Sequence, residues 1–396
     1  MPKRTIIIFI IAVIALLVVG AVLYFLTMPE ETKEKGFLPG IFPSAPGVNE
    51  PGAPSEPSQE TIKEIITAPS GNLIQLTNQS VSGATFKDGR VRYIERATGH
   101  IYEVDPDGRN RVRISNTTIP KVFNVIWSKH KDYAVLRYYD VNEDTGQNIV
   151  QNLAVHFTGS TTQGILLPQN IASITTAPKE NKILYFVPYN NTNILISADF
   201  ENKNQKQLFS TAFGEFKISW PDSDFVSLLS KPASFANGFL YKIDIRSGRL
   251  TKILGDIPGL NVLWSPDGNK IIYSATQQDK PTLFILDTTT KNDIPLNLQT
   301  LVEKCVWSAL EQNVVYCAEP ANIPSGKYPE SWYQGEVSFN DVLLKKDFST
   351  GEVKIFNLEG YQFDIINLFL DEDEQYLFFT NKKDGSLWSL QLTNGI

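Results

Sequence analysis

Residues 262–275 read VLWSPDGNKIIYSA and predict the first hairpin of a small antiparallel sheet. Residues 262–264 favour a short strand, and Ser-Pro-Asp-Gly at 265–268 suits a type I turn, because proline presets φ and glycine accepts the left-handed conformation that follows. Residues 271–273 return as a strand rich in β-branched and aromatic side chains. A third strand ending at Asp287 and a fourth near 294–298 complete one four-stranded unit.

The same pattern recurs along the chain with a period near 43 residues and one longer spacing in the sixth unit. Units begin at 84–95, 125–138, 174–187, 218–230, 262–274, 305–317 and 368–380. Four-stranded units of this length are typical of a β-propeller, in which each sheet packs against its neighbours around a central channel. The sequence therefore predicts an all-β fold, a seven-bladed β-propeller with four-stranded antiparallel blades, over residues 71–396.

Closure of the ring follows from the two ends of this region. The last unit reaches only its third strand, at 386–392, while residues 73–77, LIQLT, look like a fourth strand that precedes the first unit. We expect these two segments to pair, because pairing leaves no exposed strand edge at the junction.

The motif SPDGNKIIYSA at 265–275, together with IYEVDPDGRNRVRIS at 101–115, resembles the TolB-type, WD-like propeller repeat. In that family a Trp-Ser-Pro-Asp-Gly turn precedes an apolar strand, and a later strand ends in Asp. The resemblance covers essentially all of 71–396, although only the unit at 262–298 matches closely. It implies the fold but no ligand, since propellers of this kind serve as periplasmic scaffolds, substrate gates or parts of enzymes.

The N-terminal region predicts a membrane anchor. Residues 6–28 are 23 uncharged, almost wholly apolar positions, long enough as a helix to span a hydrocarbon core of about 30 Å. Lys3 and Arg4 precede them, so we expect residues 1–5 to stay in the cytoplasm and the rest to be exported. The apolar run is longer than that of a cleaved signal peptide and ends without an A-x-A site, which favours an uncleaved anchor.

Residues 29–70 are rich in Pro, Gly, Ser and Glu and predict a linker, with a brief helix over 60–67. These expectations define a single-pass protein of the cytoplasmic membrane, with its N-terminus inside and its propeller outside the cytoplasm. The domains are a cytoplasmic tail (1–5), a transmembrane helix (6–28), a linker (29–70) and a propeller (71–396).

The search for chemistry finds no catalytic motif. There is no G-x-S-x-G elbow, no phosphate-binding glycine loop and no metal-ligand spacing among the three histidines. We therefore expect no catalytic residues and no enzyme activity. The net charge of −7 and pI near 5.2 argue against a nucleic-acid partner.

Acidic residues repeat where third strands end, and two interpretations are open. These positions are Asp105, Asp199, Asp244, Asp287 and Asp347. They could form a ring of carboxylates, or each could hydrogen-bond the backbone of its own turn; we favour the second interpretation.

Asp140, Asn142 and Asp144 place oxygen side chains at alternate positions of one loop and are a weak candidate for Ca²⁺ binding. Thr145 stands where an EF-hand needs glycine, and Gln151 where it needs a bidentate carboxylate. The alternative is a solvated hairpin, and no other cofactor is expected.

Cys305 and Cys317 are the two cysteines of the chain, and they flank the first hairpin of unit six. If Trp307 pairs with Val315, the cysteines lie directly opposite each other, close enough for a disulfide. A bridge suits an exported domain; two buried free thiols are the alternative.

The long spacing in unit six locates an insertion at 318–338, AEPANIPSGKYPESWYQGEVS. Tyr328, Trp332 and Tyr333 make it the candidate binding loop, because long loops on rigid rings often carry recognition and aromatic residues anchor interfaces. Alternatively, these rings fold back over the propeller or plug its channel.

The leading functional interpretation is a membrane-anchored, extracytoplasmic protein-binding or scaffold module of the cell envelope. Its partners are expected to be envelope proteins of unknown identity, with the membrane contacted through the N-terminal helix. The alternative is an envelope enzyme, or an enzyme accessory, that acts on glycan or peptide at the channel mouth.

Overall fold

The computed structural model describes residues 63–66, 73–115, 117–142, 145–158, 161–358 and 360–392. These residues belong to one compact unit, which spans Glu60–Ile396. None of its described helices is long and apolar enough to cross a membrane. The predicted tail at 1–5, the predicted transmembrane helix at 6–28 and nearly all of the predicted linker lie outside the described residues.

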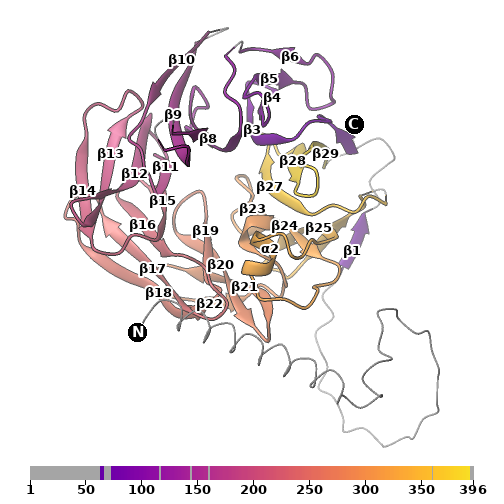
Figure 1. Ribbon diagram of the computed structural model, residues 1–396. Coiled ribbons are helices and arrows are strands. Elements are labelled where there is room, and N and C mark those ends of the chain that lie inside the picture. The colour runs from indigo at the N-terminus through magenta and orange to yellow at the C-terminus, as the bar shows by residue number, and fades with distance from the viewer. Residues whose placement is uncertain are drawn as a thin grey trace, which may run out of the picture. The chain divides into compact units, whose positions relative to one another are not determined.

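Seven sheets of mostly antiparallel strands surround a common axis (Figure 1). From the axis outward the strands follow sequence order, except that a strand from the N-terminal end of the domain lies outermost in two of the sheets. Blade 1 consists of β3 (Val81–Lys87), β4 (Arg90–Glu95), β5 (Ile101–Val104) and β6 (Val112–Arg113). Blade 2 consists of β7 (Val122–Trp127), β8 (Tyr133–Val141), β9 (Asn148–Thr158) and β10 (Thr161–Leu166). Blade 3 consists of β11 (Ser173–Thr176), β12 (Lys182–Tyr189), β13 (Thr192–Asp199) and β14 (Lys206–Thr211).

Blade 4 consists of β15 (Phe216–Asp222), β16 (Phe225–Ser230), β17 (Asn237–Asp244) and β18 (Leu250–Pro258). Blade 5 consists of β19 (Asn261–Trp264), β20 (Lys270–Gln277), β21 (Lys280–Asp287) and β22 (Asp293–Pro295). Blade 6 consists of β23 (Cys305–Trp307), β24 (Val314–Pro320), β25 (Asp341–Asp347) and β26 (Val353–Phe356). A 3-10 turn, η2 (Val302–Lys304), precedes β23, and a short helix, α2 (Glu330–Tyr333), lies between β24 and β25. The predicted seven-bladed, four-stranded architecture is confirmed.

Blade 7 closes the ring as predicted. It consists of β27 (Ile365–Leu370), β28 (Tyr376–Asn381), β29 (Leu387–Gln391) and, from the other end of the domain, β2 (Leu73–Gln75). Leu73 pairs with Leu390, and the backbone N–H of Leu76 donates to the Leu387 carbonyl at 2.8 Å. Both ends of the ring are thus held in one sheet.

Blade 6 has a fifth strand that the sequence did not predict. β1 (Lys63–Ile66) runs parallel to β26, with Lys63 beside Val353 and Ile66 beside Phe356. The helix expected over 60–67 is therefore wrong for these four residues. A β-branched pair within the segment suits a strand once a sheet edge is available, a tertiary effect that local sequence does not reveal.

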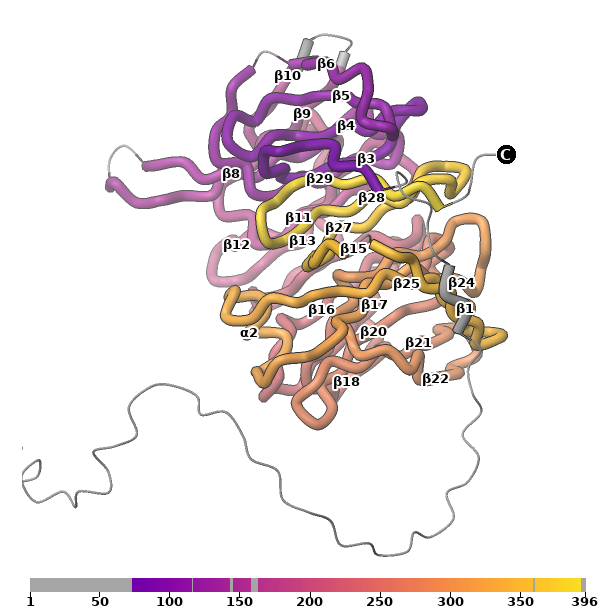
Figure 2. Tube along the Cα trace, turned by 90° about the vertical axis from the view of Figure 1, so that its right-hand side faces the viewer, coloured from indigo at the N-terminus to yellow at the C-terminus, as the bar shows by residue number. Residues whose placement is uncertain are grey.

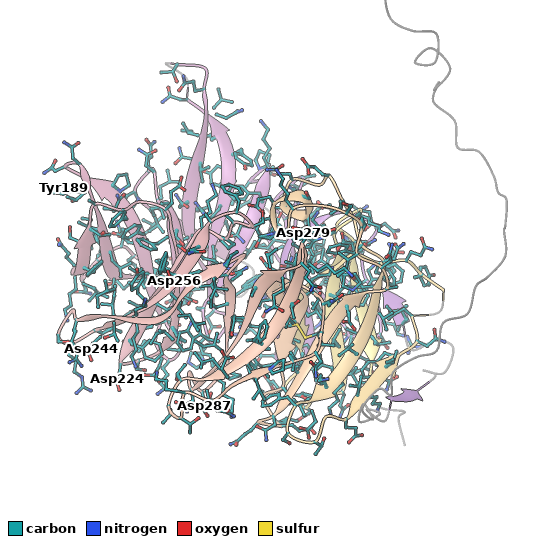
Figure 3. All side chains as sticks on the ribbon, turned by 90° about the horizontal axis from the view of Figure 1, so that it is seen from below. Tyr189, Asp224, Asp244, Asp256, Asp279 and Asp287 are labelled. Carbon is teal, nitrogen blue, oxygen red and sulfur yellow. A yellow bond between two sulfur atoms is a disulfide. The ribbon has the colours of Figure 1, made fainter. Side chains whose placement is uncertain are left out.

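The ring has two different faces, which the strand order defines. Hairpins between first and second strands, and between third and fourth strands, lie on the turn face; connections between second and third strands, and between blades, lie on the loop face. Figure 3 shows Asp224, Asp244 and Asp287 along the turn face and Tyr189 on the opposite side. The hairpin of β8 and β9 projects from the loop face (Figure 2).

The core lies between the blades, since each strand alternates its side chains toward two neighbours. In β8, Ala134 and Leu136 join the cluster shared with blade 1, whereas Val135 joins the cluster shared with blade 3. All three are fully buried. The predicted turn at 265–268 is also present: Gly268 has a φ of +71°, and its N–H donates to the Ser265 carbonyl at 2.9 Å.

Candidate functional site

The loop face carries every prominently exposed aromatic side chain of the described residues. Each lies near the end of a second strand, between a second and a third strand, or between two blades: Tyr139, Tyr189, Phe213, Phe235, Tyr333 and Tyr361. Phe213 and Phe235 are the most exposed, at 73% and 83%. The turn face, in contrast, exposes only the aliphatic side chains of Val112, Leu250 and Leu310 among large apolar residues of the described chain. This asymmetry makes the loop face the candidate interaction surface.

The predicted binding loop does not present its aromatic residues as expected. Tyr328 is fully buried and Trp332 is 4% exposed, because both pack with Leu301 and Phe339 in a small apolar cluster. Burial of two large rings stabilises the folded loop by several kcal/mol, about 1.5–3 for each large apolar side chain. Only Tyr333 keeps an exposed ring edge. The structure thus corrects the assignment of Tyr328 and Trp332 as exposed anchors.

Instead, the insertion binds four blades together on the loop face. The Thr276 hydroxyl of blade 5 donates to the Tyr328 carbonyl at 2.7 Å. In blade 4, the backbone N–H of Ser234 donates to Glu330 Oε1 at 2.8 Å. In blade 7, Lys382 Nζ donates to the Trp332 carbonyl at 2.8 Å. The loop, which is rooted in blade 6, is therefore held as a rigid part of the surface.

A buried charge cluster fixes the base of the insertion. Lys304 Nζ lies 2.7 Å from Asp341 Oδ2 and 2.7 Å from Asp364 Oδ1, and all three side chains are inaccessible to solvent. Burial raises the pKa of Asp341 to about 6, against the attraction of Lys304. Burial also opposes ionisation of Asp364, but Lys304 and several hydrogen bonds hold the pKa of that carboxyl below its ordinary value.

A chain of polar side chains crosses the channel mouth from blade 4 to the insertion. Lys217 Nζ lies 3.4 Å from Asn261 Oδ1, and Asn261 Nδ2 donates to Glu303 Oε1 at 2.6 Å. The Tyr333 hydroxyl donates to Glu303 and lies 3.2 Å from Asn261 Nδ2. Burial of the hydroxyl end, followed by the charge of Glu303, raises the pKa of Tyr333 far above its ordinary value. Tyr333 therefore stays protonated at physiological pH.

Two cavities adjoin this row of polar side chains, and Lys217 lines both. One, of about 410 Å³, lies on the loop face between blades 3 and 4. The other, of about 300 Å³, is enclosed by inner strands of blades 3 to 5 and includes Trp220 and Trp264. The loop face thus combines exposed rings, a cavity and a polar channel mouth.

Two of the three residues proposed for calcium lie in the described chain, and each accepts a hydrogen bond from the backbone of its own hairpin. Asp140 Oδ1 accepts from the backbone N–H of Val141 at 2.9 Å, and Asn142 Oδ1 accepts from that of Thr145 at 3.0 Å. Asp144 lies outside the described residues. Over the described part of the chain, no group of three or more His, Cys, Asp or Glu side chains could hold a metal ion.

The repeated aspartates bond their own turns. Backbone N–H groups of the same turn donate to Asp199, Asp244, Asp287 and Asp347 at 2.6 to 2.8 Å. Asp105 instead accepts from the Asn110 side chain at 2.6 Å. These carboxylates therefore shape the turn face and form no common site.

Cys305 and Cys317 lie opposite each other in β23 and β24, with a Cα–Cα distance of 4.1 Å and an S–S distance of 2.09 Å. Both belong to the cluster between blades 5 and 6. The bond joins the two innermost strands of the blade that carries the insertion.

Sequence reasoning missed the polar channel mouth and the exposed phenylalanines. A signal for the mouth was present: Lys217 and Asn261 each stand three residues before a tryptophan of a first strand, Trp220 and Trp264, and Glu303 stands four residues before Trp307. For the phenylalanines, the signal was an aromatic residue within a loop of small residues, as in Ala-Phe-Gly at 212–214 and Ser-Phe-Ala at 234–236.

Comparisons with known proteins address the class of fold. No protein family matches the sequence, and no curated protein matches it. Solved structures do match: an oligogalacturonate lyase from Vibrio parahaemolyticus is 11% identical with a TM-score of 0.57, over 81% of this chain and 94% of that one. The WD40 domain of Neurospora crassa Pan2 is 10% identical with a TM-score of 0.52, over 83% and 98%.

A β-propeller domain from Myceliophteria thermophila is also 10% identical, with a TM-score of 0.51, over 81% of this chain and 99% of that one. Together these similarities define a WD40-like β-propeller. They also correct one expectation. The sequence predicted that the protein is not an enzyme, but a structurally similar propeller is a lyase. The missing motifs therefore do not exclude catalysis, because a propeller can support an activity without them.

Proposed function

We propose that the protein is a binding module whose loop face docks another protein of the cell envelope. The observation that carries the proposal is the confinement of all prominently exposed aromatic side chains of the described residues to one face. Scattered exposed apolar residues are normal on any protein, whereas their concentration on one face is typical of an interaction surface. Aromatic side chains contribute strongly to such interfaces because they bury large areas at low entropic cost.

The rigid setting of these rings supports the same proposal. In the loop that carries Phe235, the backbone N–H of Ser234 donates to Glu330 of the insertion. In the loop before blade 4, the backbone N–H of Phe213 donates to Thr211 Oγ1 at 3.2 Å. A surface that is ordered before binding loses less conformational entropy when a partner docks.

Crosslinking in native cells tests this proposal. The variant Phe213→Ser/Phe235→Ser should lose crosslinked partners that the wild-type protein retains. The matched control is Leu250→Ser/Leu310→Ser, which removes two exposed apolar side chains from the turn face. An unchanged partner set in the first variant, or an equal loss in the control, would contradict docking on the loop face.

We also propose that the module is anchored in the cytoplasmic membrane and lies outside the cytoplasm. The apolar sequence at 6–28, preceded by Lys3 and Arg4, supports the anchor. The paired cysteines support an oxidising compartment. Protease added to intact cells without their outer layers, at a concentration that digests the purified propeller, should degrade it; full protection under these conditions would contradict this location.

A second candidate is an enzyme, or an enzyme accessory, that acts on glycan or peptide at the channel mouth. The observation that favours it is the hydrogen-bonded group of Lys217, Asn261, Glu303 and Tyr333 beside two cavities. Glu303 could accept a proton there and Tyr333 could donate one, the usual roles of these side chains. Cleavage of oligogalacturonate or peptides by the wild-type protein, lost in Glu303→Gln but retained in Glu336→Gln, would support this candidate; no cleavage by the wild type would contradict it.

A further inference from the structure

The cavity between blades 3 and 4 has a composition that indicates its ligand. It has a volume of about 410 Å³ and opens on the loop face, where Lys217, Lys231 and Glu215 line it with Ser173, Phe216 and Pro232. We propose that this cavity binds an acidic segment of a partner protein that carries large apolar side chains beside its carboxylates. The inference rests on the docking function proposed above and names the chemistry of the docked segment.

The charge of the cavity supports an acidic ligand. Lys217 and Lys231 bring two positive charges and Glu215 one negative charge, whereas the whole protein carries a net charge of −7. In the described part of the chain, neither lysine is in an ion pair, and the side-chain hydrogen bond of Lys217 is to the neutral amide of Asn261, at 3.4 Å. Both ammonium groups are therefore available to the carboxylates of a ligand. Glu215 repels a carboxylate placed beside it and so favours ligands whose acidic groups lie at the two lysines.

Two exposed phenylalanines, close in the sequence to residues that line the cavity, indicate the apolar part of the ligand. Phe213 precedes the lining residue Gly214, and Phe235 follows the lining residue Pro232 by three positions. They are the two most exposed large apolar side chains of the described residues. Contact with a leucine-sized or aromatic side chain would bury much of this area, at roughly 25 cal/mol per Å².

A protein segment fits these features better than a glycan. A phenylalanine ring can stack on the C–H face of a sugar but offers no hydrogen bond to its hydroxyls, whereas it packs against apolar side chains with both its faces and its edges. Carboxylates of the ligand next to such side chains would fix how the docked segment is oriented, because charge complementarity sets the register of a complex more than it adds affinity. An acidic glycan is therefore the competing outcome that the experiment must separate.

Fluorescence anisotropy on the full chain in detergent provides the test. The probe is a fluorescein-labelled hexapeptide of alternating Glu and Phe, and the reference is its Gln–Phe counterpart. At low ionic strength we expect the wild-type protein to prefer the Glu–Phe peptide about tenfold, and the variant Lys217→Gln/Lys231→Gln to lose that preference. Phe213→Ser/Phe235→Ser should weaken both peptides alike.

The same pair of blades supplies a matched control. Lys179 and Lys206 line a cavity of about 220 Å³ on the turn face between blades 3 and 4. The variant Lys179→Gln/Lys206→Gln changes the net charge equally and should keep the preference for the Glu–Phe peptide. An equal loss in this control would show that the effect comes from overall charge, and would overturn the assignment.

Three further results would also overturn it. The first is a wild-type protein that does not distinguish the two peptides. The second is oligogalacturonate that binds in a manner dependent on Lys217 while the peptide does not, which would assign the cavity to an acidic glycan. The third is a set of crosslinked partners that requires Phe213 and Phe235 but not the two lysines; docking on the loop face would then stand, and the acidic ligand alone would be wrong.

Discussion

Trp332 donates its indole N–H to both carboxylate oxygens of Asp364, each at 3.1 Å, and so joins the insertion of blade 6 to the start of blade 7. The same carboxylate binds Lys304 Nζ and accepts from the backbone N–H of Phe339. One buried aspartate therefore connects the ring, the insertion and a buried cation. Most of the stability of the loop face should depend on this connection.

Asp364→Ala should lower the free energy of unfolding by about 3–5 kcal/mol, because it leaves Lys304 buried with half of its charge compensation removed. Urea denaturation of the wild type and the variant measures this change. The control is Asp224→Ala, which breaks an ion pair with Arg246 whose side chains are 69% and 85% exposed; it should change stability by less than about 0.5 kcal/mol. Similar effects of the two substitutions would contradict the role given to the buried cluster.

Asp341 should make stability fall with rising pH. Its pKa is raised from 3.8 to about 6 in the folded protein, so the folded state holds this proton more tightly than the unfolded chain. Between about pH 4 and pH 6 the folded state therefore binds more protons, and the free energy of unfolding contributed by this group falls, on the order of 3 kcal/mol in total.

Asp341→Asn removes this titration. The difference in stability between wild type and variant, measured by denaturation at several pH values, should change through that window in favour of the variant. Asp244→Asn is the control: turn N–H groups lower the pKa of Asp244, so its contribution is lost only as pH falls below the ordinary range of aspartate. Parallel pH profiles for wild type and Asp341→Asn would contradict the assignment.

Reduction of the bond between Cys305 and Cys317 should lower the melting temperature. The two residues are separated by 12 positions, and closing a loop of that size stabilises a protein by about 3 kcal/mol in the chain-entropy description. Thermal unfolding with and without a reductant measures the effect. Cys305→Ala/Cys317→Ala should melt at a lower temperature than the oxidised wild type and should not respond to the reductant.

Replacement of Leu73–Gln75 by Gly-Ser-Gly should open the ring. This change removes the buried Leu73 side chain and lowers strand propensity where β2 closes blade 7. Limited proteolysis should then cleave within blades 1 and 7, and the unfolding transition should broaden. The same kind of replacement at Lys63–Ile66 is the control, because β1 adds to a blade that already has four strands; it should leave the ring resistant to protease.

The sequence predicted the ring because the repeat is local. The Ser265–Gly268 turn and the strands around it can be recognised from neighbouring residues alone, and the pairing of Leu73 with Leu390 follows from counting strands. The candidate site was harder to predict, since it depends on contacts between blades. The sequence made Trp332 a candidate binding residue, but it is buried and donates to Asp364, 32 positions away, a contact that no local pattern indicates.

Whereas the burial of Trp332 was not predicted, for two phenylalanines it was their exposure that could not be predicted from the sequence. Phe213 and Phe235 are apolar residues, and sequence alone suggests burial for such side chains. Their exposure follows from the position of their loops on the loop face: Phe213 lies between blades 3 and 4, and Phe235 lies between the second and third strands of blade 4. The strand β1 was missed for a related reason: its conformation depends on an edge offered by β26, nearly 300 residues later.

The direction of β1 has a spatial consequence. Because β1 is parallel to β26, Lys63 lies beside Val353, where β26 begins at the turn face. The described chain therefore enters blade 6 on the turn face, at the outer edge of the blade, opposite to the loop face where a docked protein would lie. A partner on the loop face would leave Lys63, where the chain enters the ring, uncovered.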